Sequence, residues 1–154
     1  SMGNQGRTGA GDVQVMSAGT GGQHSEFNLE NEDTTLFQIW IIPDRPGGEP
    51  GWGQREFPRN DRSGAFATLA SGIDGDDALP IRADARVAGA TVKAGETVRY
   101  TLGAGRHAYL VPATGKVRVG DVEANARDGV AIRDVPEIVI EAIEDAELVL
   151  VDSR

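Results

Sequence analysis

Short segments in which apolar and charged residues alternate dominate the second half of the sequence. Residues 116–119, 137–141 and 147–152 each show this pattern, the last two with denser apolar centres of Val, Ile and Leu. Successive side chains of a strand point to opposite faces, so a period of two predicts strands with one or both faces buried. No window shows a convincing apolar repeat at the helical period of 3.6 residues. The sequence therefore predicts an all-β protein.

Turn-forming residues separate the alternating segments. The 154 residues include 21 glycines and 7 prolines, which supply the backbone conformations that tight turns need. From about residue 65 to the C-terminus, strand and turn signals follow one another at the spacing typical of a sandwich or barrel. Residues 61–154 are predicted to form one barrel domain. Residues 44–60, rich in Pro, Gly and charge, are predicted to be a linker or crossing arm without a regular element.

Charge and composition exclude several classes of function. The formal net charge is −9, from 15 Lys and Arg against 24 Asp and Glu, and the basic residues form no stripe, which argues against direct nucleic-acid binding. The absence of cysteine excludes disulfides and thiolate metal sites. No apolar run approaches the roughly 18–20 residues that span a bilayer, and the first residues lack the apolar core of a signal peptide. We therefore expect a cytoplasmic protein.

The residues best suited to metal chemistry lie in residues 1–43. There the sequence predicts a strand over residues 13–17, a glycine-rich hairpin loop over 18–22, and a returning strand through His24 and Glu26. Residues two apart on a strand share a face, so this pair would offer an imidazole nitrogen and a carboxylate oxygen, which suit Fe, Mn, Ni, Cu or Zn. The alternative is an ordinary polar sheet face, and a catalytic metal site normally needs three protein ligands.

Other polar and aromatic residues are assigned structural roles. Phe37 and Trp40, on a predicted strand over residues 36–42, are expected to pack, and Trp52 to line or cover a cavity. His107 is interpreted as a hydrogen-bonded or surface residue, because neither a second His nor a suitably spaced Glu accompanies it.

Two loops invite ligand interpretations that the sequence does not favour. The glycine-rich loop at 19–22 precedes no helix, so a hairpin turn is preferred to a phosphate cradle. The acidic run at 74–77 is interpreted as a solvated loop. Weak Ca²⁺ binding is the alternative, although the run lacks the closing Glu of an EF-hand loop.

Three motifs in the first zone together resemble the pirin family of bicupins. They are GDVQVMSAGTG (residues 11–21), HSEFN (24–28) and LFQIWIIP (36–43), and SMGN (1–4) is similar to the segment that precedes them in longer members. The resemblance implies a cupin-type, jelly-roll-like barrel. Residues 61–154 would be the C-terminal cupin, 44–60 the linker, and 1–43 the C-terminal remnant of the N-terminal cupin, forming an additional partial sheet.

The resemblance also implies a metal site of which only half is present. Pirins hold an iron-like ion with two His of a His-x-His motif and with the His and Glu of His-Ser-Glu, which correspond here to His24 and Glu26. The chain has two histidines, His24 and His107, so the His-x-His motif has no counterpart. Fe or another divalent transition metal is therefore expected to be absent or weakly bound. A start at an internal methionine, a truncation and a natural short relative all fit this pattern.

Three functions remain open at this stage. The favoured one is a non-catalytic binding or interaction module, which would form a homo-oligomer through an exposed sheet edge or bind a protein partner, without contacting a membrane. The alternative that the resemblance implies is a metal-dependent, quercetin 2,3-dioxygenase-like oxidoreductase, with Glu26 as ligand and catalytic base and with the missing ligands supplied by a longer chain or a partner. The third is a remnant without independent function.

Overall fold

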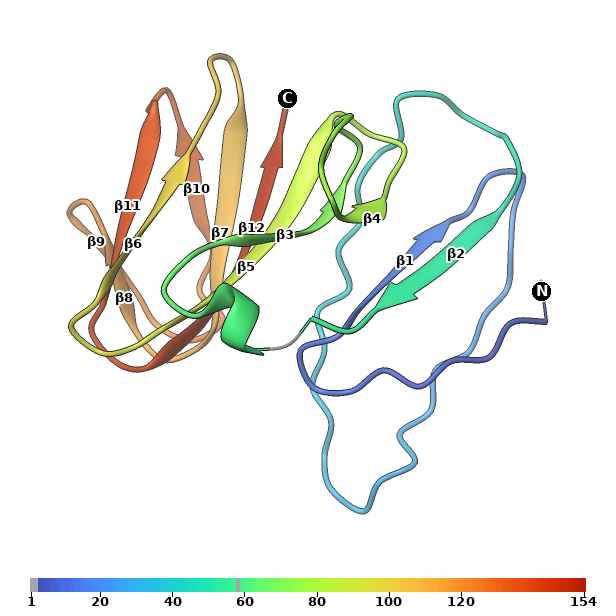
Figure 1. Cartoon of the computed structure of the whole chain (residues 1–154), viewed down its shortest axis with the longest axis horizontal. Helices are drawn as coiled ribbons and strands as arrows, with labels where there is room; N and C mark the ends of the chain where they lie inside the picture. Colours follow the sequence, from blue (N-terminus) through green and yellow to red (C-terminus); the bar gives the residue numbers. More distant parts are fainter. Residues whose placement is uncertain (1–2, 58) are drawn as a thin grey trace.

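The computed structural model describes residues 3–57 and 59–154, so the first two residues of the SMGN motif lie outside the described part. Apart from one short 3-10 helix, the regular elements of the described residues are strands (Figure 1). They are β1 (Val13–Ser17), β2 (Gly51–Arg55), η1 (Arg59–Arg62), β3 (Ala67–Ser71), β4 (Leu79–Pro80), β5 (Ala85–Val92), β6 (Thr97–Thr101), β7 (His107–Thr114), β8 (Val117–Val119), β9 (Val122–Ala124), β10 (Val130–Arg133), β11 (Glu137–Ala142) and β12 (Ala146–Ser153). Among these residues, no helix is long and apolar enough to cross a membrane.

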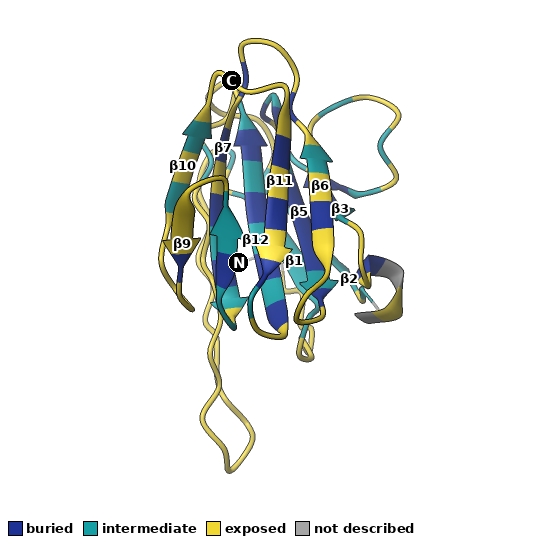
Figure 2. Ribbon diagram, turned by 90° about the vertical axis from the view of Figure 1, so that its left-hand side faces the viewer, coloured by how far each residue is buried: buried dark blue, intermediate teal, exposed yellow. Residues whose placement is uncertain are grey.

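Two facing sheets form the C-terminal barrel. The larger has the order β10-β7-β12-β5-β3-β4 and the smaller the order β6-β11-β8-β9, and in Figure 2 the smaller sheet lies in front of the larger one. Strand β12 is central, because it pairs antiparallel with β5 on one side and with β7 on the other. The all-β, jelly-roll-like prediction is confirmed, as are the alternating segments that became β8, β11 and β12.

The main core lies between the two sheets, and it follows the alternation in the sequence. In β11 every second side chain is buried, and in β12 the buried positions begin at Ala146 and recur at every second residue to Asp152. The largest apolar side chains that are almost completely buried come from strands of both sheets: Val92, Leu110, Val117, Ile138, Ile140 and Leu150.

A second, smaller apolar cluster lies on the outer face of the larger sheet. Val13 and Val15 of β1 pack there against the cluster formed by Ala70, Leu79 and Val87, together with Val149 and Val151 of β12. The larger sheet is therefore partly covered on its outer face as well, which agrees with the apolar residues that β12 has at positions of both parities. The N-terminal residues thus form a layer, built on β1 and β2, that is docked onto the C-terminal barrel (Figure 1).

The prediction that residues 44–60 contain no regular element was wrong. Strand β2 lies inside this segment and pairs antiparallel with β1 along all five residues of both strands. Its glycines allow a close approach to the barrel: a Cβ atom added at Gly53 would lie 3.3 Å from a methyl carbon of Leu79. The strand is held by its pairing with β1, and the absence of a side chain at Gly53 leaves room for Leu79 of β4.

Two other predicted strands of the first zone were also wrong. Residues 18–21 make a turn, but residues 24–26 form no strand, and β2 takes the place beside β1 that was predicted for them. Residues 36–42 also lack regular structure, despite their β-branched and aromatic composition. A strand needs a neighbour to pair its backbone groups, and the described residues provide none beside this segment.

Candidate functional site

His24 and Glu26 lie on an irregular segment between β1 and β2, and both are exposed. The alternation argument that placed them on one face of a strand therefore does not hold, because no strand forms there. The long loop that contains them extends from the β1–β2 layer in Figure 1 and is exposed at every position from 20 to 40.

The carboxylate of Glu26 is nevertheless held in place by β1 and β2. The side-chain amide of Gln14 donates from Nε2 to Glu26 Oε1 over 3.0 Å, and the indole of Trp52 donates from Nε1 to Gln14 Oε1 over 3.2 Å. An indole N–H can only donate, so Trp52 fixes which end of the Gln14 amide faces it. The NH₂ group is thereby directed to the Glu26 carboxylate.

This arrangement was not predicted, although the alternation of apolar and polar residues in β1 indicates that Gln14 lies on the face away from the barrel. Val13 and Val15 point to the barrel, so Gln14 and Met16 must point to the opposite face of the same strand. In the register of the two strands Met16 lies opposite Trp52. What the sequence could not show was that β2, almost forty residues away, would be the neighbour of β1.

The donor atoms present do not complete a transition-metal site. Among the described residues, no group of three or more His, Cys, Asp or Glu side chains is placed to hold a metal ion. His24 and Glu26 remain a chemically suitable pair of an imidazole and a carboxylate, but a pair falls short of the three protein ligands typical of catalytic metal centres.

The segment that follows Glu26 exposes large apolar side chains. Phe27 is 79% exposed, Leu29 80%, Leu36 63%, Trp40 86% and Ile42 90%. The prediction that Trp40 packs is wrong in this chain, and the physical reason is the missing neighbour for residues 36–42. We refer to residues 27–42 as the apolar segment.

Part of the apolar segment lies against the barrel and leaves a small pocket. Phe37, Gln38 and Ile39 form one wall, and the other consists of side chains from β7 and β12, namely Tyr109, Val111, Val149 and Val151. The pocket has a volume of about 250 Å³. Phe37 is 48% exposed and Tyr109 52%, so this contact covers the outer sheet face only partly.

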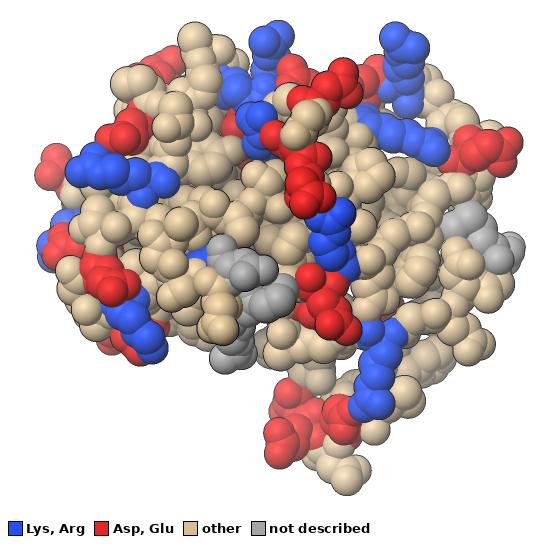
Figure 3. All heavy atoms as spheres, in the orientation of Figure 1, with Lys and Arg blue, Asp and Glu red and all other residues tan. Residues whose placement is uncertain are grey.

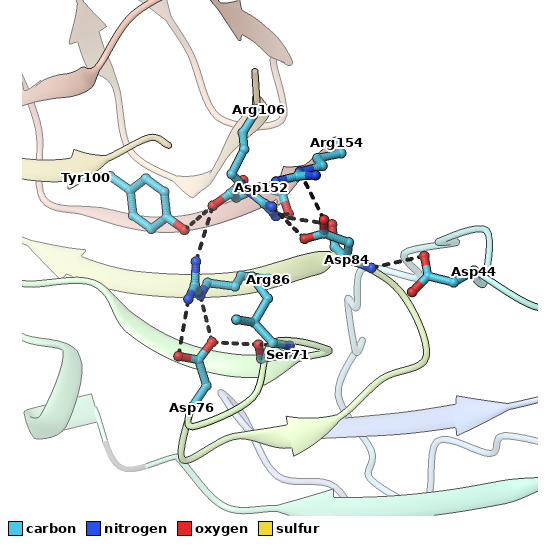
Figure 4. Close-up of polar contacts among 10 residues, drawn as sticks. Asp44, Ser71, Asp76, Asp84, Arg86, Tyr100, Arg106, Asp152 and Arg154 are labelled. Carbon is cyan, nitrogen blue, oxygen red and sulfur yellow. Dashed lines mark hydrogen bonds and ion pairs between the residues drawn. The ribbon is translucent and has the colours of Figure 1, made fainter. Parts of the chain in front are cut away.

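A buried polar cluster lies at one end of the C-terminal barrel (Figure 4). Asp152 of β12 is 0% exposed and accepts hydrogen bonds from Arg106 Nε over 2.5 Å and from the Tyr100 hydroxyl over 2.8 Å. Arg106 also donates from Nη1 to Asp84 Oδ1 over 2.6 Å. Burial raises the pKa of Tyr100, and its hydrogen bond to Asp152 raises it further, so this hydroxyl remains a donor. Every member is satisfied within the fold, which is the signature of a structural cluster.

Asp76 of the acidic run at 74–77 is connected to this cluster through Arg86, whose Nη1 lies 4.0 Å from Asp152 Oδ2. Asp76 accepts from Arg86 Nε over 2.7 Å and from the Ser71 hydroxyl over 2.6 Å, and Asp77 pairs with Arg55 at 2.9 Å. The interpretation of this run as a solvated loop is therefore wrong at Asp76, because residues of β3 and β5 hold it against the barrel.

Acid should weaken the fold through Asp76. The hydrogen bond from Arg86, followed by that from Ser71, lowers the pKa of Asp76 below its ordinary value of 3.8. A carboxyl group with a lower pKa in the folded state stabilises the fold above the unfolded pKa, and this contribution is lost as the pH falls through the folded value. We expect the free energy of unfolding to fall below about pH 4, and to fall less in Asp76→Asn. Urea unfolding at stepped pH values tests this, with Asp74→Asn as the control for charge loss in the same loop; parallel pH profiles for Asp76→Asn and the unchanged chain would contradict it.

The remaining candidates lie apart from His24 and Glu26. His107 is exposed at the start of β7, opposite Arg133 of β10, as the surface interpretation predicted. On the face drawn in Figure 3, Lys and Arg side chains lie beside Asp and Glu and form no basic stripe. Arg118, for example, pairs with both Glu123 and Glu141 at 2.9 Å.

Comparisons with protein families match both parts of the chain. A family model described as the quercetinase C-terminal cupin domain matches residues 68–153, and a model described as pirin matches residues 1–41. The first match includes all strands of the barrel from β4 to β12 and most of β3. The second includes β1, His24, Glu26 and nearly all of the apolar segment.

Individual relatives agree with these matches. A pirin-like protein of Caulobacter vibrioides is 63% identical over 99% of this chain and 66% of its own length, and a quercetin 2,3-dioxygenase of Escherichia coli is 35% identical over 99% and 65%. The crystal structure of a bacterial pirin from E. coli in complex with nickel(II) superposes with a TM-score of 0.86 at 32% identity, covering 98% of this chain and 65% of that one. The chain thus spans somewhat less than two thirds of the length of these relatives.

Proposed function

Because this chain belongs to the pirin family of cupin proteins, we propose that its 154 residues act as a non-catalytic binding module that carries half of a metal site. The barrel has a continuous apolar core. The β1–β2 layer docked on it presents His24, Glu26 and the apolar segment at the surface. The partner would be a polypeptide that covers this segment.

The observation that carries the proposal is that the carboxylate of Glu26 is held by a hydrogen bond although too few metal ligands accompany it. Gln14 and Trp52 orient Glu26, yet the described residues place no third ligand with it. Five large apolar side chains between 63% and 90% exposed follow in the same segment. Large exposed apolar patches with polar neighbours are typical of interaction sites.

A quercetin 2,3-dioxygenase-like oxidoreductase is the second candidate. The name of the E. coli relative and the nickel(II) bound by the similar crystal structure favour it. In that case His24 and Glu26 would be two ligands of a site whose other donors lie outside these residues, and Glu26 would also be the candidate base. A flavonol substrate such as quercetin is proposed only for this second candidate.

Metal content and oxygen consumption of the purified chain distinguish the two candidates. We expect far less than one transition-metal ion per chain by elemental analysis, and no oxygen uptake with quercetin above the buffer rate. One firmly bound ion per chain, with oxygen uptake that His24→Ala and Glu26→Ala both abolish, would refute the non-catalytic proposal. Glu30→Ala, an exposed acidic residue in the same loop, is the matched control.

The binding part of the proposal has its own test. The third of the C. vibrioides relative that this chain does not match can be prepared as a separate polypeptide and mixed with the chain. Binding that is weakened by Trp40→Glu and by Ile42→Glu would support a role of the apolar segment in partner recognition. Equal binding by these variants would place the contact elsewhere.

A further inference from the structure

We propose that residues 44–49 form a strap that fastens the β1–β2 layer to the barrel, and that Arg106 sets the strength of this fastening from inside the barrel. The layer can then be released as a unit while the barrel stays folded. This inference goes beyond the proposed function, because it concerns how two parts of the chain are held together and involves neither a metal nor a partner.

The strap lies between the layer and the barrel and forms hydrogen bonds with both. On the side of the layer, the carbonyl oxygen of Gly48 accepts a hydrogen bond over 3.0 Å from the N–H of Thr20, in the turn that follows β1. On the side of the barrel, the next carbonyl oxygen, that of Glu49, accepts over 2.7 Å from Nη2 of Arg82. Neighbouring peptide groups of the strap thus bind the two parts that it joins.

The other end of the strap is bonded to the loop between β4 and β5, residues 81–84. Asp44 donates its backbone N–H to the carbonyl oxygen of Arg82 over 2.9 Å. Its carboxylate oxygen Oδ1 accepts from the backbone N–H of Asp84 over 3.2 Å (Figure 4). Both bonds involve main-chain groups of the loop, so the strap binds there only while the loop keeps its conformation.

Arg106 holds this loop from inside the barrel. Its Nη1 donates to Asp84 Oδ1 over 2.6 Å and its Nη2 to the carbonyl oxygen of Asp84 over 3.1 Å, so one planar guanidinium fixes both the side chain and the main chain of a loop residue. The same guanidinium is bound through Nε to the buried Asp152. The polar contacts thus continue from the strap into the barrel in the order Asp44, Asp84, Arg106 and Asp152 (Figure 4).

Two cations allow the carboxylate of Asp44 to approach the loop. Asp84 also carries a carboxylate, and two like charges close together repel each other unless cations offset them. Arg106 binds Oδ1 of Asp84, and Arg154 pairs with its Oδ2 at 3.1 Å. Loss of the Arg106 contact would therefore weaken the strap in two ways, because it frees the loop and leaves the two carboxylates less well compensated.

Other contacts also hold the layer. Arg55 at the end of β2 pairs with Asp77 at 2.9 Å, but the Asp77 side chain is 96% exposed, and water screens such a pair. Val13 and Val15 pack on the outer face of the larger sheet, and apolar packing is not directional. Of these contacts, the strap is the one that the buried Arg106 can control.

Hydrogen exchange of the backbone amides in the intact chain, followed by mass spectrometry, tests the proposal. A two-stranded sheet alone is marginal in water, so the amides of β1 and β2 exchange when the layer leaves the barrel, and those of β11 report on the barrel itself. Asp44→Ala should speed exchange in β1 and β2 by about tenfold, as expected for the loss of a hydrogen bond to a charged group, and leave β11 unchanged. Arg106→Lys should speed exchange in β1 and β2 by a similar factor. The double variant should add little to either single one, because both changes break the same path.

Matched variants separate the strap from a general loss of stability. Tyr100→Phe removes another donor to Asp152 without touching Asp84, so it should leave exchange in β1 and β2 unchanged. Asp77→Ala removes the exposed ion pair of the layer and should change this exchange by less than about twofold. If Arg106→Lys does not unfold cooperatively in urea, Asp84→Ala breaks the same contact from its half-exposed side and replaces it.

Three results would overturn the proposal. Equal acceleration of β1, β2 and β11 in Asp44→Ala would make the layer and the barrel one cooperative unit. An effect of Asp77→Ala as large as that of Asp44→Ala would place the fastening elsewhere. Effects of Asp44→Ala and Arg106→Lys that multiply in the double variant would mean that Arg106 does not act through the strap. None of these results changes the metal content or the oxygen uptake, by which the proposed function is tested separately.

Discussion

Asp152→Ala is expected to lower the free energy of unfolding by about 3–5 kcal/mol, the loss typical of breaking a buried ion pair on one side. Asp152 is fully buried and accepts from both Arg106 and Tyr100. Its removal would leave Arg106, which is only 8% exposed, with Asp84 as its remaining carboxylate partner. The cost arises because a buried cation loses its compensating charge and a buried hydroxyl loses its acceptor.

Urea unfolding followed by circular dichroism measures this loss. The matched control is Glu141→Ala, which removes the carboxylate of an Arg–Glu pair on the surface of the smaller sheet. Water screens that pair, so its loss should be much smaller. Equal losses in the two variants would mean that Asp152 is not the centre of the cluster.

The burial of Asp152 could be inferred from the sequence, but its partners could not. In β12 the residue has the same parity as Leu148 and Leu150, so a strand places its side chain on the face that forms the core. Arg106 lies 46 residues earlier in the chain and Tyr100 lies 52 earlier. Their contact with Asp152 depends on how β6, β7 and β12 are arranged in the two sheets, and local periodicity carries no information about that arrangement.

In the N-terminal residues, the alternation pattern predicted the strands less well than it did in the barrel. Local pattern predicted β1 correctly, but it also predicted strands at 24–26 and 36–42 that do not form, and it missed β2. The alternation of apolar and polar residues indicates which face of a segment would be buried if a neighbouring strand were present. Where the described residues offer no neighbour, a segment with strand composition stays irregular, and its apolar side chains stay exposed.

His24 and Glu26 stay predicted ligands, and the contacts around Glu26 were not predicted. Motif resemblance identified His24 and Glu26, and the structure retains both at the surface. Their orientation follows from Gln14 and Trp52, which meet only because β1 pairs with β2. Sequence motifs thus indicated which groups could bind a metal, while the tertiary pairing of two short strands determines how one of them is held.

Leu150→Ala should also destabilise the chain strongly, by about 3–5 kcal/mol, at the upper end for a Leu to Ala change in a core. Leu150 is 0% exposed on the central strand β12, where it lies opposite Ala88 of β5 and Leu110 of β7. Two flanking strands and the facing sheet leave little freedom for the surroundings to relax into the space vacated by the side chain.

Val151→Ala is the informative comparison, because the next residue of the same strand points to the other face. Val151 is only partly buried, between the outer cluster and the small pocket beside the apolar segment. Val151→Ala should lower the free energy of unfolding by less than half of the loss expected for Leu150→Ala. It should leave the slope of the unfolding free energy against urea concentration unchanged. A loss at Val151 equal to that at Leu150 would show that the docked β1–β2 layer is as much a part of the cooperative fold as the barrel core.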